Sequence, residues 1–155
     1  MEVNPLPPPG GNLTKAIVGM WVLKSREDLD TAGQIVIDPF LGEDPLGIIT
    51  FGPRHFAAQF MKRDRSKPEQ IVQRAKASNN SAGVNGYDAY FGTYIVDETA
   101  GTLTTLIEGS VSPANIGNKY VRDARIFDAM LLIRLKTTAI DGTDVTRTNT
   151  FRRVG

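Results

Sequence analysis

Apolar and polar residues alternate along most of this 155-residue chain, with the period of two that is typical of half-buried β-strands. The clearest segments are two arms at 87–96 and 102–108, which are rich in β-branched and aromatic residues. A polar turn ending in Gly101 joins them, so they predict a β-hairpin. Long arms with interleaved polar residues suit a barrel wall, which has one face on a packed layer and the other on a cavity or water.

Further strand patterns are separated by short turns and loops rich in Gly, Pro, Asp and Asn. We expect strands over 20–26, 34–38, 46–51, 55–62, 119–127, 130–136 and 145–154. Within 55–62 both faces carry apolar residues, so the alternation leaves open which face is inside. The antiparallel order predicts an all-β fold, either an up-and-down barrel or a sandwich. A barrel is favoured because the first strand, with Trp21, and the last, Arg-bearing strand would then meet.

Two segments are predicted to be helical. Residues 12–18 can form one or two turns with Asn12 as the N-cap. A longer helix is predicted over 66–77, since Ser66 and Glu69 have the spacing of a capping box. This helix joins two strands and is expected to cover one end of the barrel. The alternative fold, the α+β cone of small cyclases and isomerases, would begin with long helices, and this chain does not.

The totals favour one globular domain, since a chain of this length buries roughly two-thirds of its unfolded surface. Lys plus Arg is 18 and Asp plus Glu is 17, so the net charge is +1. A charge this close to zero does not indicate binding to nucleic acid or to an anionic membrane. The absence of cysteine excludes disulfides and cysteine-ligated metals. The single histidine, His55, leaves little basis for a metal site or a serine triad, and we expect it to be exposed at a barrel rim.

The N-terminal segment contains four prolines in its first nine residues, which favours extended polyproline II. We expect residues 1–12 to be a flexible tail and 13–155 to form the barrel domain. A tail that folds over the barrel mouth or onto a second subunit is the alternative, and a homodimer is left open. The chain has neither a secretory signal nor a run of about 18 apolar residues, so a cytoplasmic protein without a membrane partner is expected.

Several motifs together resemble the lipocalin-like domain family of bacteria and fungi, which are small calycin-type barrels. The segment 86–97 is the most similar, and 57–61 resembles the family's Ser-Ala-Gln-Leu-Met strand. The opening Gly19-x-Trp21 resembles the lipocalin Gly-x-Trp signature, and the chain closes on a similar aromatic-x-Arg-Val motif. The resemblance implies an antiparallel lipocalin-like β-barrel. It also implies that Trp21 plugs the closed end against Arg152 or Arg153 through a cation–π contact.

Two positions depart from the family pattern. Thr105 stands where members often carry His, and Phe151 stands where Trp is more usual. A role that depends on that His cannot be transferred to this chain. The family is defined by its domain and not by a shared reaction, so the resemblance indicates the fold more strongly than the activity.

Glu108 is the leading catalytic candidate, together with Arg122. A carboxylate that faces a dry barrel interior has a raised pKa and can act as a general acid or base. The alternative is a structural ion pair between Glu108 and Arg122. Because Thr105 and Glu108 are an odd number of residues apart, only one of them points inward unless a bulge intervenes.

An apolar pocket with a few neutral hydrogen-bonding groups is the usual composition of a small-molecule site. Gly92, between Tyr90 and Tyr94 on one strand face, leaves room for a ligand ring or for neighbouring backbone. No metal-loop spacing, phosphate loop or dinucleotide fingerprint is found, so no cofactor is expected. The ligand-binding candidates are Trp21, Phe51, Gln59, Tyr90, Tyr94 and Thr105, each of which has a structural role in the barrel as its alternative.

Three functions remain open from the sequence. The first, which we favour, is a cofactor-independent cyclase, isomerase or dehydratase that acts on a hydrophobic metabolite, in natural-product biosynthesis. Positioning alone can supply several kcal/mol of catalysis, so such an enzyme need not display a motif. The second is a non-catalytic carrier of an apolar ligand. The third is a structural module whose pocket is filled by side chains.

Overall fold

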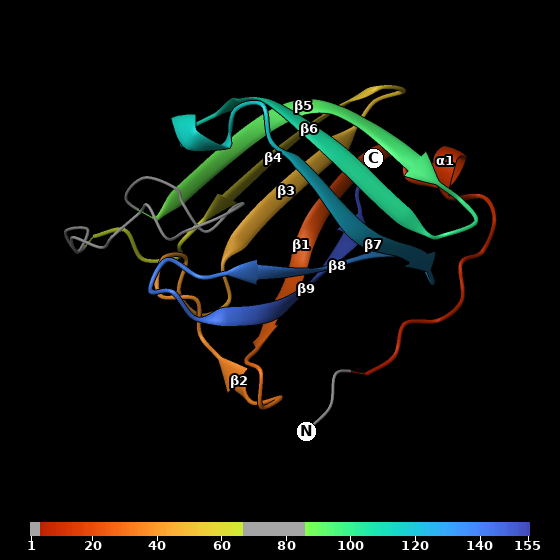
Figure 1. Cartoon of the computed structure of the whole chain (residues 1–155). Coiled ribbons are helices and arrows are strands. Elements are labelled where there is room, and N and C mark those ends of the chain that lie inside the picture. The colour runs from red at the N-terminus through yellow and green to blue at the C-terminus, as the bar shows by residue number, and fades with distance from the viewer. Residues whose placement is uncertain (1–3, 67–85) are drawn as a thin grey trace.

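The described part of the chain forms a nine-stranded antiparallel sheet (Figure 1). The computed structural model describes residues 4–66 and 86–155. Neighbours in the sheet follow chain order from β3 to β9, and β1 pairs with both β3 and β9, so the sheet closes into a barrel. This confirms the predicted lipocalin-like up-and-down β-barrel. The strands are β1 (Gly19–Leu29), β2 (Ile35–Val36), β3 (Leu46–Phe51), β4 (His55–Met61), β5 (Tyr87–Asp97), β6 (Thr102–Ser110), β7 (Lys119–Phe127), β8 (Met130–Thr138) and β9 (Asp144–Arg153).

The tightest turn of the barrel joins β7 to β8. Its two central residues, Asp128 and Ala129, both have left-handed backbone, with φ of 50° and 60°. Two consecutive residues of this conformation match the right-handed twist of the flanking strands. The two-residue connection therefore fixes the register of this hairpin, in which Phe127 pairs with Met130.

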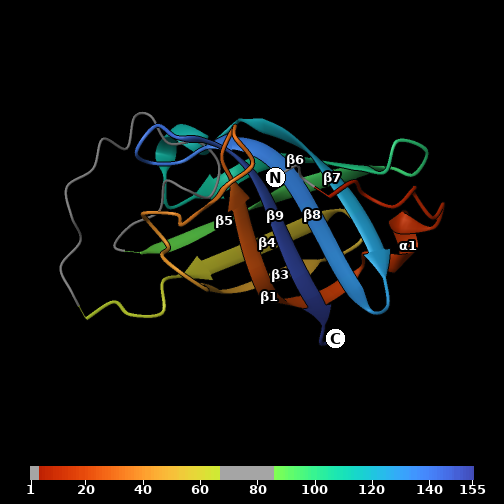
Figure 2. The ribbon, with the colours of Figure 1, turned by 90° about the horizontal axis from the view of Figure 1, so that it is seen from below.

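The short helix α1 (Leu13–Ala16) lies at one end of the barrel (Figures 1 and 2). Leu13 and Ile17 pack in the same core as Trp21 there. The Trp21 side chain is fully buried, and its Nε1 donates to the carbonyl oxygen of Ile17 over 2.9 Å. The Arg153 guanidinium lies 4.2 Å from the centre of the indole ring. Trp21 is thus the plug that the sequence resemblance implies, with Arg153 as its partner. The helix predicted over 66–77 lies outside the described residues, apart from Ser66.

Two β-bulges set which side chains enter the barrel. In β1 the pairing with β9 shifts between Leu23 and Ser25, so Lys24 is an extra residue. In β6, Ile107 and Gly109 pair with consecutive residues of β5, so Glu108 is an extra residue. An extra residue exchanges the inner and outer faces of the strand beyond it. Because of the first bulge, Trp21, Arg26 and Asp28 all face the interior even though their spacing is uneven.

The interior divides into two parts along the barrel axis. The apolar end surrounds Trp21 and consists of aliphatic and aromatic side chains. The charged layer follows it, because the β1–β9 pairing continues from Leu23–Phe151 to Arg26–Asn149 and Asp28–Arg147. The apolar end contains Leu13, Ile17, Trp21, Leu23, Phe51, Phe56, Leu131 and Phe151, and the charged layer contains Arg26, Asp28, Asp38, Asp88, Arg147 and Asn149.

The N-terminal segment lies along the outside of the barrel wall. Arg134 of β8 donates to the carbonyl oxygen of Asn4, and Arg125 of β7 donates to that of Pro7, each over 2.6 Å. Both contacts are exposed at the protein surface. They do not test the predicted division of the chain into a flexible tail at 1–12 and a barrel domain at 13–155. In the described part of the chain, no helix has the length and apolar character needed to cross a membrane.

Candidate functional site

The β5–β6 hairpin presents Thr105 to the interior and Glu108 to the outside. Thr105 is buried, whereas Glu108, an odd number of residues further along the strand, is exposed on the outer face as the alternation from Thr105 through Ile107 requires. The predicted inward, desolvated position of Glu108 is therefore wrong, and the argument for a general acid or base at this residue fails with it. An ion pair with Arg122 is equally unsuited, because Arg122 is buried on the inner face of β7.

On β4 the inner face carries Phe56, Ala58 and Phe60, which are all buried. Gln59 is exposed on the outer face, where its Oε1 accepts a hydrogen bond from the Tyr87 hydroxyl. The prediction that Gln59 contributes to an interior pocket is therefore wrong. The sequence left this facing open because residues on both sides of the strand are apolar. His55 is exposed at the start of β4, as expected.

Three other ligand-binding candidates lie in or beside the apolar end. Trp21 and Phe51 are fully buried there, and the Tyr94 ring packs edge-on against Phe51 at 5.1 Å between ring centres. The Tyr94 hydroxyl donates to the carbonyl oxygen of Gly52. A Cβ at Gly92 would collide with the Leu106 carbonyl oxygen, so this glycine accommodates neighbouring backbone.

The remaining candidates, Tyr90, Thr105 and Arg122, meet at a small internal cavity of about 20 Å³. This volume is roughly that of one ordered water molecule. The cavity lies where the apolar end meets the charged layer. Its lining consists of Ile49, Phe56, Phe60, Tyr90, Leu103, Thr105, Arg122, Ile133, Leu135, Asn149 and Phe151.

Arg122 places a buried positive charge at the cavity wall. Its Nη1 donates to Thr105 Oγ1 over 2.5 Å, and its guanidinium lies 5.1 Å from the centre of the Tyr120 ring. Burial lowers the pKa of Arg122, while the nearby Tyr90 and Tyr120 oppose this shift. Burial also raises the pKa of Tyr90. The Tyr90 hydroxyl is therefore a neutral group beside a cation.

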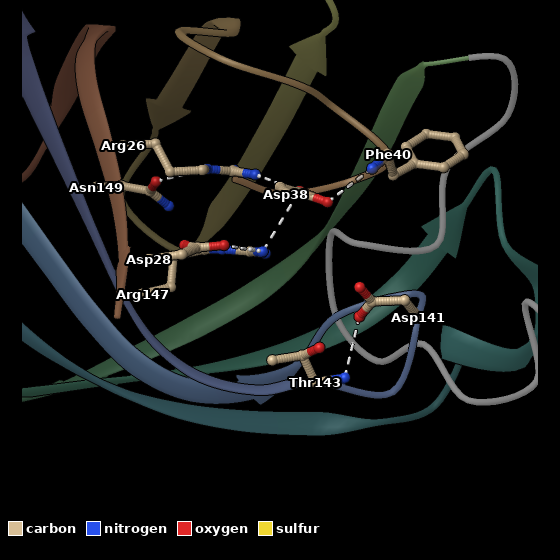
Figure 3. Close-up of polar contacts among 8 residues, drawn as sticks. All are labelled: Arg26, Asp28, Asp38, Phe40, Asp141, Thr143, Arg147 and Asn149. Atoms are coloured by element: carbon tan, nitrogen blue, oxygen red, sulfur yellow. Dashed lines mark hydrogen bonds and ion pairs between the residues drawn. The ribbon is translucent and has the colours of Figure 1, made fainter. Parts of the chain in front are cut away.

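The charged layer contains a continuous network of ion pairs (Figure 3). Arg147 holds Asp28 with two hydrogen bonds of 2.9 and 2.8 Å, and its Nη2 lies 3.3 Å from Asp38. Arg26 reaches the same oxygen of Asp38 over 3.2 Å and donates to Asn149 over 2.9 Å. Asp38 also accepts the amide of Phe40, which ties the loop after β2 to this network. Two arginines thus share two carboxylates inside the barrel.

Burial and neighbouring charges act differently on the two arginines of this network. Burial lowers the pKa of Arg26 to about 10, and the positive charge of Arg147 adds to this effect. For Arg147 burial also favours the neutral form, but the hydrogen bonds and charge of Asp28, with the charge of Asp38, raise its pKa overall. The positive charge of Arg147 is therefore stabilised by its carboxylate partners, whereas the positive charge of Arg26 is only partly compensated for its burial.

Asp88 is the group that the network does not satisfy. It is fully buried on the inner face of β5, and neither of its carboxyl oxygens has a hydrogen-bond partner of acceptable geometry among the described residues. Burial raises the pKa of Asp88 to about 7, although the positive charge of Arg26 opposes the rise. Arg26 Nη2 is likewise buried without a partner in the described residues.

Arg26 and Asp88 both flank Phe60. The Arg26 guanidinium lies 5.0 Å from the centre of the Phe60 ring, and Asp88 is the cross-strand partner of Phe60. Phe60 in turn lines the internal cavity. The site therefore combines an unpaired donor and a titratable carboxyl with an aromatic wall, and this combination can bind a polar group or transfer a proton. Within the described ranges no three acidic or histidine side chains cluster as metal ligands.

Sequence reasoning missed the charged layer almost completely. One signal was available in β9, where Val145, Arg147, Asn149 and Phe151 alternate with threonines. An inner face that reads Val-Arg-Asn-Phe predicts a polar band across an apolar barrel. Nothing comparable marks Arg26 and Asp28, since the bulge at Lys24 breaks the alternation of β1. Asp88 lies inside the segment 86–97 that most resembles the family, but the sequence there does not indicate whether its side chain points into or out of the barrel.

A family model described as a lipocalin-like domain matches residues 18–153. Among solved structures, a similar chain is the zebrafish ileal bile acid-binding protein in complex with cholic acid, with 19% sequence identity and a TM-score of 0.41. The match covers 90% of this chain and 100% of that one. At this level of similarity, the ligand of that protein says nothing about this chain. No curated protein matches it.

Proposed function

Because this chain belongs to the lipocalin-like domain family, we propose that its barrel binds one small, largely apolar molecule in the interior. The supporting observation is the pair formed by Arg26 Nη2 and Asp88, which are buried and unpartnered in the described residues beside an aromatic cavity wall. Buried polar groups are nearly always hydrogen-bonded, so two such groups without partners in the described part of the protein call for a water or a ligand between them, and we take the ligand as the proposal. A purely structural interior would be more stable with apolar residues there.

The volume of the cavity limits how this ligand is bound. About 20 Å³ holds a water molecule but not a metabolite, so binding requires the interior to expand. The aromatic rings of Phe56, Phe60 and Tyr90 pack against one another, with 5.9 and 6.3 Å between the ring centres of Tyr90 and its two neighbours. A ligand that displaces this aromatic group would contact apolar side chains on one side and the charged layer on the other.

A pair of tryptophan substitutions tests binding inside the barrel. Leu103 lines the cavity, whereas Val121 is 65% exposed on the neighbouring strand β7. We expect the wild type to bind the neutral fluorescent probe N-phenyl-1-naphthylamine saturably. Leu103→Trp, which fills the interior, should lose this binding, and Val121→Trp should keep it. Equal binding by the two variants would place the probe on the surface and contradict the proposal.

A second measurement does not depend on how Leu103→Trp folds. In the wild type, methyl NMR signals of Ile133, which lines the cavity, should shift on titration with the same probe. Signals of Ile95, which is 73% exposed on β5, should not shift. Shifts at Ile95 without shifts at Ile133 would exclude interior binding.

A second candidate function is acid–base catalysis on the bound molecule, as a cofactor-independent isomerase, cyclase or dehydratase of natural-product biosynthesis. The observation that favours it is Asp88, a buried carboxyl with a pKa of about 7. A general acid or base works best when its pKa is near the working pH. Arg26, whose positive charge acts on Asp88, has its Nη2 free of partners in the described residues and is suited to stabilise a developing oxyanion. In this function Asp88 takes the role that the sequence assigned to Glu108.

Hydrogen exchange at carbon tests catalysis without knowledge of the natural substrate. Apolar ketones incubated with the protein in D₂O should gain deuterium next to the carbonyl group, as measured by mass spectrometry. The exchange should be lost in Asp88→Asn and kept in Glu108→Gln, because only Asp88 faces the interior. If the wild type bound the ketones but exchanged no hydrogen, acid–base catalysis by Asp88 would be excluded and only the binding function would stand.

A further inference from the structure

We infer that the molecule bound inside this barrel carries a carboxylate, which is held between Arg26 Nη2 and the carboxyl group of Asp88, with one proton shared between the two carboxyl groups. This inference rests on the proposed binding function and names the chemical class of the ligand. It assigns a direct ligand contact to two residues that the sequence did not select.

The two unpartnered groups offer complementary hydrogen bonds to a carboxylate. Arg26 Nη2 is a buried donor, and the side chain of Arg26 is only 3% exposed. The other nitrogens of this guanidinium are already used, since Nε donates to Asn149 and Nη1 to Asp38. When Asp88 is protonated its hydroxyl is a second donor. A carboxylate has two oxygens, and it can accept one hydrogen bond from each residue.

The balance of buried charge selects an anion. In the described part of the interior, three arginines (Arg26, Arg122 and Arg147) face three aspartates (Asp28, Asp38 and Asp88). Because the pKa of Asp88 is about 7, this carboxyl is largely neutral below that pH, which leaves one positive charge in excess. An anionic head group restores neutrality in a medium where unbalanced charge is expensive. An amine would add a further positive charge beside Arg26.

Binding of a carboxylate is coupled to the protonation of Asp88. The charged groups that act on Asp88 are Arg26 of β1, Arg147 of β9 and Asp38 of the loop after β2, and Tyr90 lies next to it on β5. A second carboxylate at hydrogen-bond distance raises the pKa of Asp88 further, because two like charges cannot both be ionised there. The complex therefore takes up a proton above pH 7, and the affinity falls by about tenfold per pH unit as the pH rises.

Three probes that differ only in their head group test the inference: octanoate, methyl octanoate and octylamine. Calorimetry in phosphate and in Tris buffer measures both the affinity and the protons taken up. We expect octanoate to bind at least about tenfold more tightly than the ester or the amine, since only octanoate provides a charge-assisted hydrogen bond to Arg26. At a pH of about 8, uptake should approach one proton per octanoate bound. Equal affinity for octanoate and its ester would overturn the inference.

Matched variants assign the effect to individual residues. Asp88→Asn should bind octanoate without proton uptake and with little pH dependence, whereas Glu108→Gln, on the outer face, should behave as the wild type. Arg26→Gln should weaken octanoate at least about tenfold and leave methyl octanoate unchanged, because a single charge-assisted hydrogen bond is lost. Arg26→Lys keeps the charge and provides a second variant if Arg26→Gln does not fold. If Asp88→Asn still took up a proton on binding octanoate, Asp88 would not be the group that is protonated, and the inference would be wrong.

The result separates the inference from the proposed function. If N-phenyl-1-naphthylamine binds inside the barrel but none of the three octyl probes shows the head-group preference, the carboxylate assignment is wrong and interior binding stands. If the neutral probe also fails to bind inside, both are wrong.

Discussion

The apolar end and the charged layer occupy the same barrel, but they contribute to it in opposite ways. At the apolar end, Trp21 is covered by Ile17 and by the Arg153 guanidinium, and its one polar atom is hydrogen-bonded. In the charged layer, Arg147 and Asp28 are well paired, while Asp88 and one nitrogen of Arg26 are not. The first region stabilises the fold by burying apolar surface. The second reduces that stability, because it buries polar groups that have no partner among the described residues.

This difference indicates where function lies. Packing, one hydrogen bond and the contact with Arg153 account for the burial of Trp21, so the Gly19-x-Trp21 opening needs no ligand to explain it. The charged layer is different because its ion pairs close around a carboxyl that burial keeps partly neutral. A barrel selected for stability alone would replace that carboxyl with an apolar residue. The layer is therefore the region whose substitution should separate stability from binding.

The largest expected effect comes from breaking the best ion pair of the charged layer. Arg147→Met leaves Asp28 buried without its two hydrogen bonds and should lower the free energy of unfolding by about 3–5 kcal/mol. Denaturant unfolding followed by circular dichroism measures the change. Arg152→Met, an exposed position on the same strand, should change the stability by less than about 0.5 kcal/mol.

The double variant Arg147→Met with Asp28→Leu sharpens this test. If the loss in Arg147→Met arises from an uncompensated charge, removal of the charge should restore most of the stability. A double variant as unstable as the single one would show that the network stabilises the barrel in its own right, and the contrast between the two regions would fail.

An intermediate effect is expected from the pH dependence that Asp88 imposes. Its pKa rises from 3.8 to about 7 on folding, so the folded chain holds a proton that the unfolded chain has released between these values. Stability therefore falls as the pH rises from about 4 to about 7 and then levels off, by at most about 4 kcal/mol. Asp88→Asn should remove this loss and be more stable than the wild type at a pH of about 8. Melting temperatures measured across this range would show it.

Glu108→Gln is the matched control for Asp88→Asn, because both substitutions remove a carboxylate from the β5–β6 hairpin. Glu108 is exposed, so its substitution should leave the pH dependence of stability unchanged. If both variants flattened the pH profile, the burial of Asp88 would not be its cause.

The smallest of these effects is expected at the apolar end. Trp21→Phe keeps an aromatic ring but loses the hydrogen bond to Ile17, the larger surface and part of the contact with Arg153. We expect a loss of about 1–3 kcal/mol without a change in the affinity for interior ligands. Val121→Ala, on the exposed outer face of β7, should have little effect on stability. If Trp21→Phe bound interior ligands more weakly than the wild type, the apolar end would be part of the binding site and the contrast between the two regions would be wrong.

The sequence predicted the strands well because their signals are local. Turn residues and alternation placed β3, β4 and β7 within a residue of their observed bounds. It predicted the candidate site less well. Tyr90, Thr105 and Arg122 do meet at the cavity, while Gln59 and Glu108 point away from it. The failures share a cause, since a strand with apolar residues on both faces does not reveal which face is inside.

The sequence by itself therefore determined the order of the strands, the closed barrel and the Trp21 plug, since these follow from period, turn chemistry and the family motifs. Only the tertiary structure decided the facing of the side chains. The extra residue Lys24 bulges out of β1 and thereby directs Arg26 and Asp28 inward, whereas on β6 the burial of Thr105 and Ile107 leaves Glu108 outside. Whether a bulge forms depends on the pairing of whole strands across the barrel, and no local window of sequence contains that information.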